Sequence, residues 1–388
     1  MRRLACIVIL ICALSCCITQ EPEEPGMNET PKALKGVSLS PRSFQSDDFL
    51  NFFQKAQYAG TVISWAGDWD ELHMENGGPK VVAELAKTYG YIPFVEVQFF
   101  EQSSGELLRP LSEETKQMYL TRTVAFTKMY TPMYFGVGIE VNVLYEKSPE
   151  DFEEFITFYN EVYYAVKDVS PETKVFTVFQ LERMKGLHGG LFGGENDSNN
   201  AQWWLLDEFP LDMAAFTTYP GLIYKDPSQI PADYYTEISQ HIELPVAFTE
   251  IGWHSNASPS GWESSETEQA AFVATFFRLL QNVNVELAVW SFLYDQDIHE
   301  PFNSMGLYGS DGKAKLAWDV WVNSGIERIR RLSGLGVTES EAIKLTRERG
   351  IIATGKSWHP GFRIFSSILI VLMFILAENL YYFNLLGM

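Results

Sequence analysis

The sequence predicts one large α/β domain of the (β/α)8 TIM-barrel class over residues 35–322. Short β-branched or aromatic runs alternate with amphipathic stretches of helical period, as expected for parallel strands joined by crossover helices. Eight strand-like runs fit into about 290 residues, and this count and length are those of a barrel. A doubly wound open sheet is the alternative, but no glycine-rich phosphate loop follows the first predicted strand.

The composition is that of a globular, acidic protein. Of 388 residues, 46% are hydrophobic and 14% aromatic, which is enough for a sizeable core and excludes wholesale disorder. Acidic side chains outnumber basic ones by 50 to 29, and the net charge of −21 argues against a nucleic-acid partner. All four cysteines lie within the first 17 residues, so the predicted barrel has no thiol for a disulfide, a metal or a nucleophile.

The N-terminal region is predicted to direct export. In residues 1–17, Arg2 and Arg3 precede an apolar run that is too short to span a bilayer, which is the pattern of a signal peptide. Residues 13–17 resemble the lipobox of prokaryotic lipoproteins, in which a cysteine is lipidated; a plain cleaved signal peptide is the alternative. Residues 18–34 form an acidic, proline-bearing linker.

The C-terminal region is predicted to reach a membrane. A basic connector over residues 323–360 precedes a hydrophobic tail over residues 361–388, within which 23 residues, 364–386, could cross a bilayer. Because Glu378 and Asn379 interrupt this run, a hydrophobic helix docked on protein is the alternative. We therefore expect an exported cell-surface protein, attached to the membrane by a lipid anchor, by a C-terminal helix or by both.

Within the barrel, each strand is predicted from its own run of β-branched or aromatic residues. The eight strands are expected over residues 36–40, 60–65, 92–97, 134–139, 174–179, 213–218, 246–249 and 286–292. Helices are expected to fill the gaps. One should begin at Pro149 after the capping residue Ser148, and another should follow Ser265, which has capping-box spacing to Glu268.

In such a barrel the chemistry lies where strands end, because the loops at their carboxyl ends converge there. Polar and aromatic residues do gather at or just after the predicted strand ends, namely Arg42, Trp65, Asp68, Trp69, Glu96, Gln98, Glu140, Asn142, Gln180, Glu182, Tyr219, Glu250, Trp253, His254, Trp290, Tyr294 and Asp295.

Among these residues, Glu140 and Glu250 are the strongest candidates for a pair of functional carboxyl groups. Each follows a strand that is predicted to be buried, where an unpartnered charge is costly unless it has a task. The fourth and seventh strands lie on roughly opposite sides of a barrel mouth, so the two acids would face each other. Two facing carboxyl groups are the apparatus of glycoside cleavage.

These segments resemble the clan of retaining (β/α)8 glycoside hydrolases. Residues 249–255 resemble the nucleophile segment of the β-1,3-glucanase family, and residues 138–142 are similar to the acid/base segment of that family and of the endo-β-1,4-galactanases. The resemblance implies a β-linked glycan substrate, with Glu250 as nucleophile, Glu140 as acid/base and Tyr219 in contact with the nucleophile. It also implies that no metal or organic cofactor takes part.

One position departs from the clan pattern. Clan members usually have asparagine directly before the acid/base glutamate, where it binds the sugar 2-hydroxyl, and this chain has Ile139. Asn142 lies two residues beyond Glu140, a displacement of about 7 Å along a strand. A non-catalytic carbohydrate-binding surface protein on the same barrel is therefore the alternative function, and a structural protein of the cell envelope is a third.

Further residues are predicted to bind substrate. The flat faces of Trp290, Trp253 and Trp65 suit the C–H faces of sugar rings, and Asn142 and Arg42 complete the predicted set.

A metal site is not expected. There is no HExxH motif and no cysteine in the barrel, so His188 and His254 are interpreted as structural. The glycine cluster over residues 189–194 is predicted to be an active-site loop.

Overall fold

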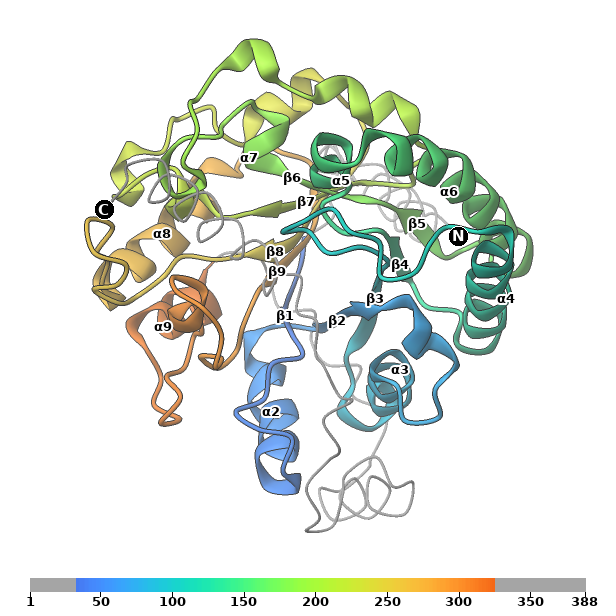
Figure 1. Ribbon diagram of the computed structural model, residues 1–388. Helices are drawn as coiled ribbons and strands as arrows, with labels where there is room; N and C mark the ends of the chain where they lie inside the picture. The colour runs from blue at the N-terminus through green and yellow to red at the C-terminus, as the bar shows by residue number, and fades with distance from the viewer. Residues whose placement is uncertain (1–32, 325–388) are drawn as a thin grey trace, which may run out of the picture. The chain divides into compact units, whose positions relative to one another are not determined.

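The computed structural model describes residues 33–324, and these form a parallel barrel surrounded by helices (Figure 1). Its strands are β1 (Leu34–Ser38), β2 (Val62–Asp68), β3 (Ile92–Gln98), β4 (Tyr134–Val137), β5 (Lys174–Phe176), β6 (Val178–Gln180), β7 (Ala214–Thr218), β8 (Val246–Ile251) and β9 (Val285–Trp290). Their order in the sheet is β5-β4-β3-β2-β1-β9-β8-β7-β6.

Thr177 alone separates β5 from β6, which makes them two halves of one strand. The first half pairs with β4 and the second half with β7, both in parallel. The nine segments are therefore the eight strands of a (β/α)8 barrel, and the predicted fold of the central domain is confirmed.

The predicted export segment and hydrophobic tail lie outside the described residues. Between residues 33 and 324, no helix has the length and apolar character needed to cross a membrane.

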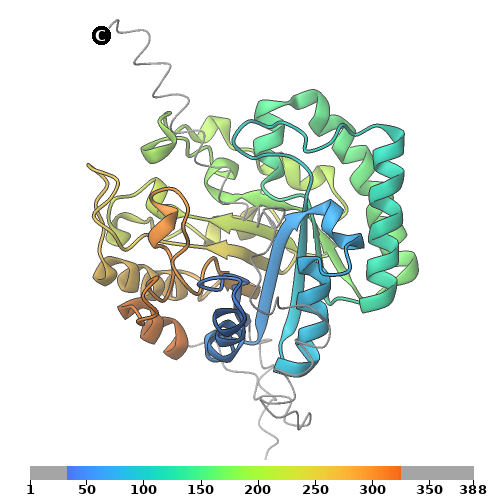
Figure 2. The same ribbon diagram turned by 60° about the horizontal axis from the view of Figure 1, so that its bottom comes forward.

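Helices cover the outside of the barrel. They are α2 (Ser46–Ala59), α3 (Gly78–Tyr89), α4 (Glu113–Tyr130), α5 (Val141–Lys147), α6 (Pro149–Val169), α7 (Leu181–Met184), α8 (Glu266–Leu279) and α9 (Leu316–Asn323). Helices α4 and α6 lie side by side along the strands (Figures 1 and 2). The predicted helix starts are confirmed: α6 begins at Pro149, and the Ser265 hydroxyl caps α8 by accepting a bond from the Glu268 amide at 3.2 Å. Ser148 was wrong as a hydroxyl cap, because its hydroxyl donates to the Asp151 carboxylate and accepts no backbone amide.

The helical ring is incomplete between β6 and β8, where the sequence predicts full crossover helices. Apart from the short helix α7, these crossovers consist of 3₁₀ turns over η2 (Gly190–Phe192), η3 (Ser198–Asn200), η4 (Trp203–Glu208), η5 (Pro220–Leu222), η6 (Pro227–Gln229) and η7 (Thr236–Gln240). Repeated prolines and glycines interrupt these segments, and both residue types end helices after a turn or two. Short turns η1 (Trp69–His73) and η8 (Phe302–Ser304) complete the loops.

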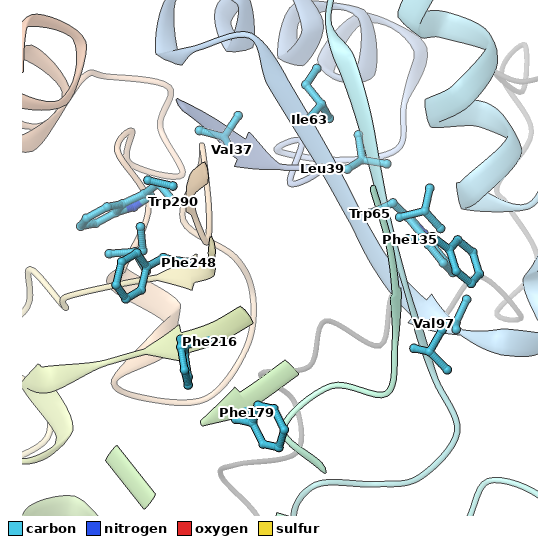
Figure 3. Packing of buried hydrophobic residues seen from close by; sticks show 14 of the residues in the cluster. Val37, Leu39, Ile63, Trp65, Val97, Phe135, Phe179, Phe216, Phe248 and Trp290 are labelled. Atoms are coloured by element: carbon cyan, nitrogen blue, oxygen red, sulfur yellow. The ribbon is translucent and has the colours of Figure 1, made fainter. Parts of the chain in front are cut away.

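The core has two layers because successive strand residues point to opposite faces. Phe94, Val178, Ala215, Ala247 and Val289 belong to the cluster that fills the barrel interior. Their neighbours along the strands, among them Phe179, Phe216, Phe248 and Trp290 in Figure 3, belong to a second cluster that packs between the barrel and the segments around it. This alternation determines which side chains at the strand ends can reach the barrel axis.

Candidate active site

Glu250 reaches the barrel axis through a β-bulge. In β8, Ala247 faces the interior and Phe248 the helices, so regular alternation would turn Glu250 outward. The pairing with β7 shifts at this point: Phe248 pairs with Phe216, and Glu250 pairs with the next residue, Thr217. The extra residue reverses the alternation, and bulges of this kind re-aim side chains next to active sites.

Tyr219 holds the Glu250 carboxylate. Its hydroxyl donates to Glu250 Oε2 at 2.5 Å and lies 2.9 Å from Ser291 Oγ. Burial and the charge of Glu250 raise the pKa of Tyr219 well above its usual value, so the phenol keeps its proton. A donor of this kind stabilises the charged form of a carboxylate.

Glu140 lies in the short turn between β4 and α5, in a left-handed backbone conformation. Gly138 has φ 83°, which breaks the strand alternation, and Glu140 itself has φ 57° at the N-terminus of α5. A non-glycine residue in this region carries strain, and such strain concentrates at functional sites. The side chain of Glu140 is fully buried.

The buried Glu140 carboxyl keeps a proton near neutral pH. Burial and the charge of Glu250 raise its pKa from 4.5 to about 8, against the opposing effect of the Thr217 hydrogen bond. Its Oε1 accepts from Thr217 Oγ1 at 2.6 Å and from Gln180 Nε2 at 3.3 Å. Its Oε2 has no hydrogen-bond partner among residues 33–324.

A network of amides fixes the position of Gln180. Asn142 Nδ2 donates to the Gln180 carbonyl at 3.1 Å, and the Gln180 amide donates back to Asn142 Oδ1 at 2.8 Å. Arg183 Nε donates to Gln180 Oε1 at 2.8 Å. This bond leaves the Gln180 amide nitrogen to donate to Glu140. Asn142, predicted to bind substrate, therefore serves to position the residue that holds Glu140.

Glu96 is a third carboxyl group at the axis. It lies on β3, two residues after Phe94, so its side chain faces the barrel interior as that of Phe94 does. It is fully buried. Neither carboxyl oxygen has a hydrogen-bond partner in the described part of the chain. Burial and the charge of Glu250 raise its pKa well above the usual range, against a smaller opposing effect of Thr249. Glu96 and Glu140 thus retain hydrogen-bonding capacity that no described residue uses, although buried polar groups are normally hydrogen-bonded.

Glu182 supports the site from behind. Its Oε1 accepts from the Tyr219 amide at 3.0 Å, from Thr218 Oγ1 at 3.1 Å and from Tyr234 OH at 2.8 Å. These bonds fix the chain end from which Tyr219 reaches Glu250.

The three tryptophans predicted to stack on substrate lie elsewhere, and this prediction is corrected. Trp290 packs against Trp321 and Phe272 outside the barrel, and its indole N–H donates to the Met305 carbonyl. Trp253 stacks on Phe272. Trp65 belongs to the same outer layer. Trp65 and Trp290 occupy outward-facing strand positions, and Trp253 lies in a loop that folds into this layer.

The remaining predicted residues have structural partners. Arg42 lies at the surface with its side chain 3.9 Å from Asp48, so it does not take part in the cluster at the axis. Asp68 forms two bonds of 2.8 Å with Arg109. His254 Nε2 lies 2.8 Å from the Trp262 carbonyl, and burial lowers its pKa.

The structure thus brings together the three residues predicted to be catalytic, Glu140, Glu250 and Tyr219. It adds three polar residues to which the sequence analysis assigned no role: Gln180, Thr217 and Ser291. Strand alternation could have identified these three polar residues. Each lies two positions after a residue that faces the barrel interior, namely Val178, Ala215 and Val289, so its side chain faces the same way. Residues 33–324 contain no group of three metal-ligating side chains that could hold an ion.

Chemically, the cluster pairs a carboxyl group that is protonated below about pH 8 with a carboxylate held by a phenol. A carboxyl group that keeps its proton can serve as an acid, and a carboxylate beside it can serve as a nucleophile or base. The cluster therefore contains the two kinds of group that proton donation and nucleophilic attack require.

Comparisons with solved structures show the same fold in known glycoside hydrolases. A variant of GH5_18 from Streptomyces cattleya, in complex with Manβ1-4GlcNAc, matches with a TM-score of 0.56 and 14% identity, over 75% of this chain and 79% of that one. The exo-β-1,4-mannosidase Op5Man5 from an Opitutaceae bacterium matches with a TM-score of 0.53 and 14% identity, over 74% and 58%. A family 39 glycoside hydrolase from Bacteroides cellulosilyticus matches with a TM-score of 0.50 and 19% identity, over 74% and 62%.

The chain therefore has the (β/α)8 barrel fold that these glycoside hydrolases share, as the sequence resemblance implies. It spans about 60% of the length of the family 39 enzyme and of the mannosidase. No protein-family model matches the sequence, and no curated protein does.

Proposed function

We propose that this protein is a retaining glycoside hydrolase that cleaves β-linked glycans. One observation carries the proposal: the raised pKa of Glu140, about 8, arises next to a second carboxylate, Glu250, that a buried tyrosine holds in place. The fold shared with known glycoside hydrolases supports it.

In the proposed reaction, Glu250 attacks the anomeric carbon while Glu140 donates its proton to the departing glycosidic oxygen. The resulting glycosyl–Glu250 ester is then hydrolysed by a water molecule, from which Glu140 removes a proton. Two inversions at the same carbon retain the β configuration. The Tyr219 hydroxyl keeps the Glu250 carboxylate oriented, and no metal or organic cofactor is needed.

The test is hydrolysis followed by product stereochemistry. The full chain is incubated with a panel of β-1,3-, β-1,4- and β-1,6-linked polysaccharides, reducing ends are measured, and the first anomer released is identified by NMR. We expect the β-anomer before mutarotation. The α-anomer would refute retention, and a panel without any reducing ends released would refute hydrolysis.

Tyr219→Phe is expected to lower kcat by about 10- to 100-fold, because a hydrogen bond to a charged group contributes about 1.5–3 kcal/mol. The acidic limb of the pH–rate profile should also move to higher pH, since the charged form of Glu250 loses a donor. Both are read from kcat and kcat/KM across pH. An unchanged acidic limb would show that Tyr219 only fills space.

A specific observation favours the second candidate, a carbohydrate-binding protein that does not hydrolyse. Ile139 is fully buried in the apolar cluster of the barrel interior, next in sequence to Glu140. It offers no hydrogen bond to a sugar 2-hydroxyl, a contact that can supply several kcal/mol in the transition state. Binding on a glycan array without release of reducing ends would select this candidate.

We also propose that the protein acts at the cell surface, attached to the membrane through residues 13–17, residues 364–386 or both. The sequence features described above support this location. Fractionation of cells that express the full chain, with and without replacement of Cys16 and Cys17 by alanine, tests it. Release of the double alanine variant from the membrane would assign the lipid anchor, and recovery of the parent in the soluble cytoplasmic fraction would refute the proposal.

A further inference from the structure

A polar cavity of about 630 Å³ lies beside α5, the helix that follows Glu140. Tyr145 and Glu146 of α5 line it on one side, and the segment from His188 to Trp204 lines it on the other. Sites for small ligands measure about 300–1,000 Å³, so this volume suits one or a few sugar units. The glycine cluster over residues 189–194 lies within the same segment.

The wall of this cavity is hydrogen-bonded to the residues that hold Glu140. Gln202 Nε2 donates to Glu146 Oε1 at 2.6 Å, and Gln202 Oε1 accepts from Asn142 at 3.0 Å. Asn142 in turn fixes Gln180, whose side chain donates to Glu140. The cavity wall is therefore held in place relative to the proposed proton donor by a continuous chain of hydrogen bonds.

Two aromatic side chains border the cavity. The ring of Tyr145 meets Trp204 edge-on, with centroids 5.3 Å apart. Trp204 is 45% exposed, although most tryptophans of the described chain are buried. An exposed indole beside amide and carboxylate groups is suited to stacking on a sugar ring whose hydroxyls bond to the polar wall.

The charge of the lining limits the ligand. Glu146, Glu195 and Asp197 contribute three carboxyl groups. Among the residues described as lining the cavity, His188 is the only basic side chain, and its Nε2 already lies 2.9 Å from Glu146 Oε1. Arg183, just outside the lining, pairs with the other oxygen of Glu146, so both nearby bases are engaged by this carboxylate and Glu195 and Asp197 remain as the negative excess. A carboxylate-bearing sugar would meet like charge without a cation to pair with, which disfavours its binding.

We propose that this cavity binds the leaving-group portion of a neutral β-linked oligosaccharide and rejects uronic-acid-containing ones. The binding site stands on the geometry above, whereas its assignment to the leaving group rests on the proposed function. Trp204 and Tyr145 form its stacking edge, and Gln202 is a hydrogen-bonding residue of its wall.

The experiment uses the full chain carrying Glu250→Gln, so that substrate is bound without turnover. Isothermal titration measures binding of neutral tetrasaccharides with β-1,3-gluco, β-1,4-gluco, β-1,4-manno and β-1,4-galacto linkages, and of uronic-acid-containing oligosaccharides of the same length. We expect at least one neutral tetrasaccharide to bind and the uronic-acid-containing ones to bind at least about tenfold more weakly, a factor that corresponds to about 1.4 kcal/mol.

Adding Trp204→Ala should weaken binding of the neutral tetrasaccharide about tenfold. Tyr164→Ala is the matched control: Tyr164 is a 64% exposed aromatic on α6 that packs edge-on against Tyr163, outside the cavity lining. It should leave affinity unchanged.

Equal affinity of the Trp204→Ala chain and its parent, equal binding of uronic-acid-containing oligosaccharides, or no binding of any neutral tetrasaccharide would overturn the proposal. The outcomes separate it from the proposed function. Hydrolysis with an unaffected Trp204→Ala variant removes the cavity from substrate binding and leaves the enzyme. Binding that depends on Trp204 without any hydrolysis keeps the sugar site and removes the catalytic role.

Discussion

Replacing Glu250 by glutamine is expected to lower kcat on any hydrolysed glycan by about 10⁴-fold or more, because an amide cannot form the covalent intermediate. Folding should survive. The glutamine side chain still offers an oxygen to the Tyr219 hydroxyl, and it removes a charge that destabilises the ionised forms of Glu96 and Glu140. Steady-state kinetics and a thermal melt on the same preparation check both expectations.

The matched control for this variant is Glu286→Gln. Glu286 is also a strand glutamate that accepts a tyrosine hydroxyl, from Tyr134 at 2.7 Å, but it lies near the start of β9, at the opposite end of the barrel. Its replacement weakens the bond to Lys174 and should cost stability without changing kcat. Turnover of the Glu250→Gln variant within tenfold of the parent would remove Glu250 from the role of nucleophile.

Replacing Glu140 by glutamine is expected to make the protein relatively more stable as the pH rises from 5 to 8. The carboxyl pKa is 4.5 in the unfolded reference and about 8 in the fold. Between these values the folded chain holds a proton that the unfolded chain has released, so this group's stabilising contribution is complete below pH 4.5 and is lost as the pH approaches 8. Glutamine does not titrate and escapes this loss.

The size of the effect follows from the shift in pKa. One pKa unit corresponds to 1.36 kcal/mol, so the shift from 4.5 to about 8 sets an upper limit of about 5 kcal/mol on the relative gain. Denaturant unfolding of both chains at pH 5 and pH 8 measures it, because the other titrating groups largely cancel in the difference. A difference that does not change between the two pH values would show that Glu140 is ionised in the fold and is not the proton donor.

Thr217→Val provides the companion measurement for activity. The Thr217 hydroxyl donates to Glu140 and lowers its pKa, so valine should move the basic limb of the pH–rate profile above that of the parent. The Glu140→Gln variant should instead lose most hydrolysis of substrates whose leaving group needs a proton. A basic limb that is the same in the Thr217→Val variant and in the parent would separate that limb from Glu140.

Much of the fold could be predicted from local pattern. The strand runs, the Pro149 helix start and the Ser265 cap are features of neighbouring residues, and each appears in the structure. The prediction of helical crossovers between β6 and β8 was wrong, because prolines and glycines divide these segments into 3₁₀ turns.

The candidate site was predictable only in part. Acidic residues at strand ends identified Glu140 and Glu250, and Tyr219 followed from the resemblance. The prediction that the tryptophans bind substrate was wrong, because the residue type that stacks on sugars also fills the space between a barrel and its helices. Trp290 stands next to the inward-facing Val289, and strict alternation would have assigned it to the outer layer.

Neighbouring residues are enough to predict the repeating order of strands and helices and the two carboxyl groups at strand ends, because local preference and spacing are properties of adjacent residues. That the charge of Glu250 acts on the buried carboxyl of Glu140 follows from the three-dimensional arrangement alone. The bulge in β8 turns Glu250 inward, and Gly138 breaks the alternation just before Glu140. Both depend on pairing with neighbouring strands, and burial among distant residues raises the pKa of Glu140.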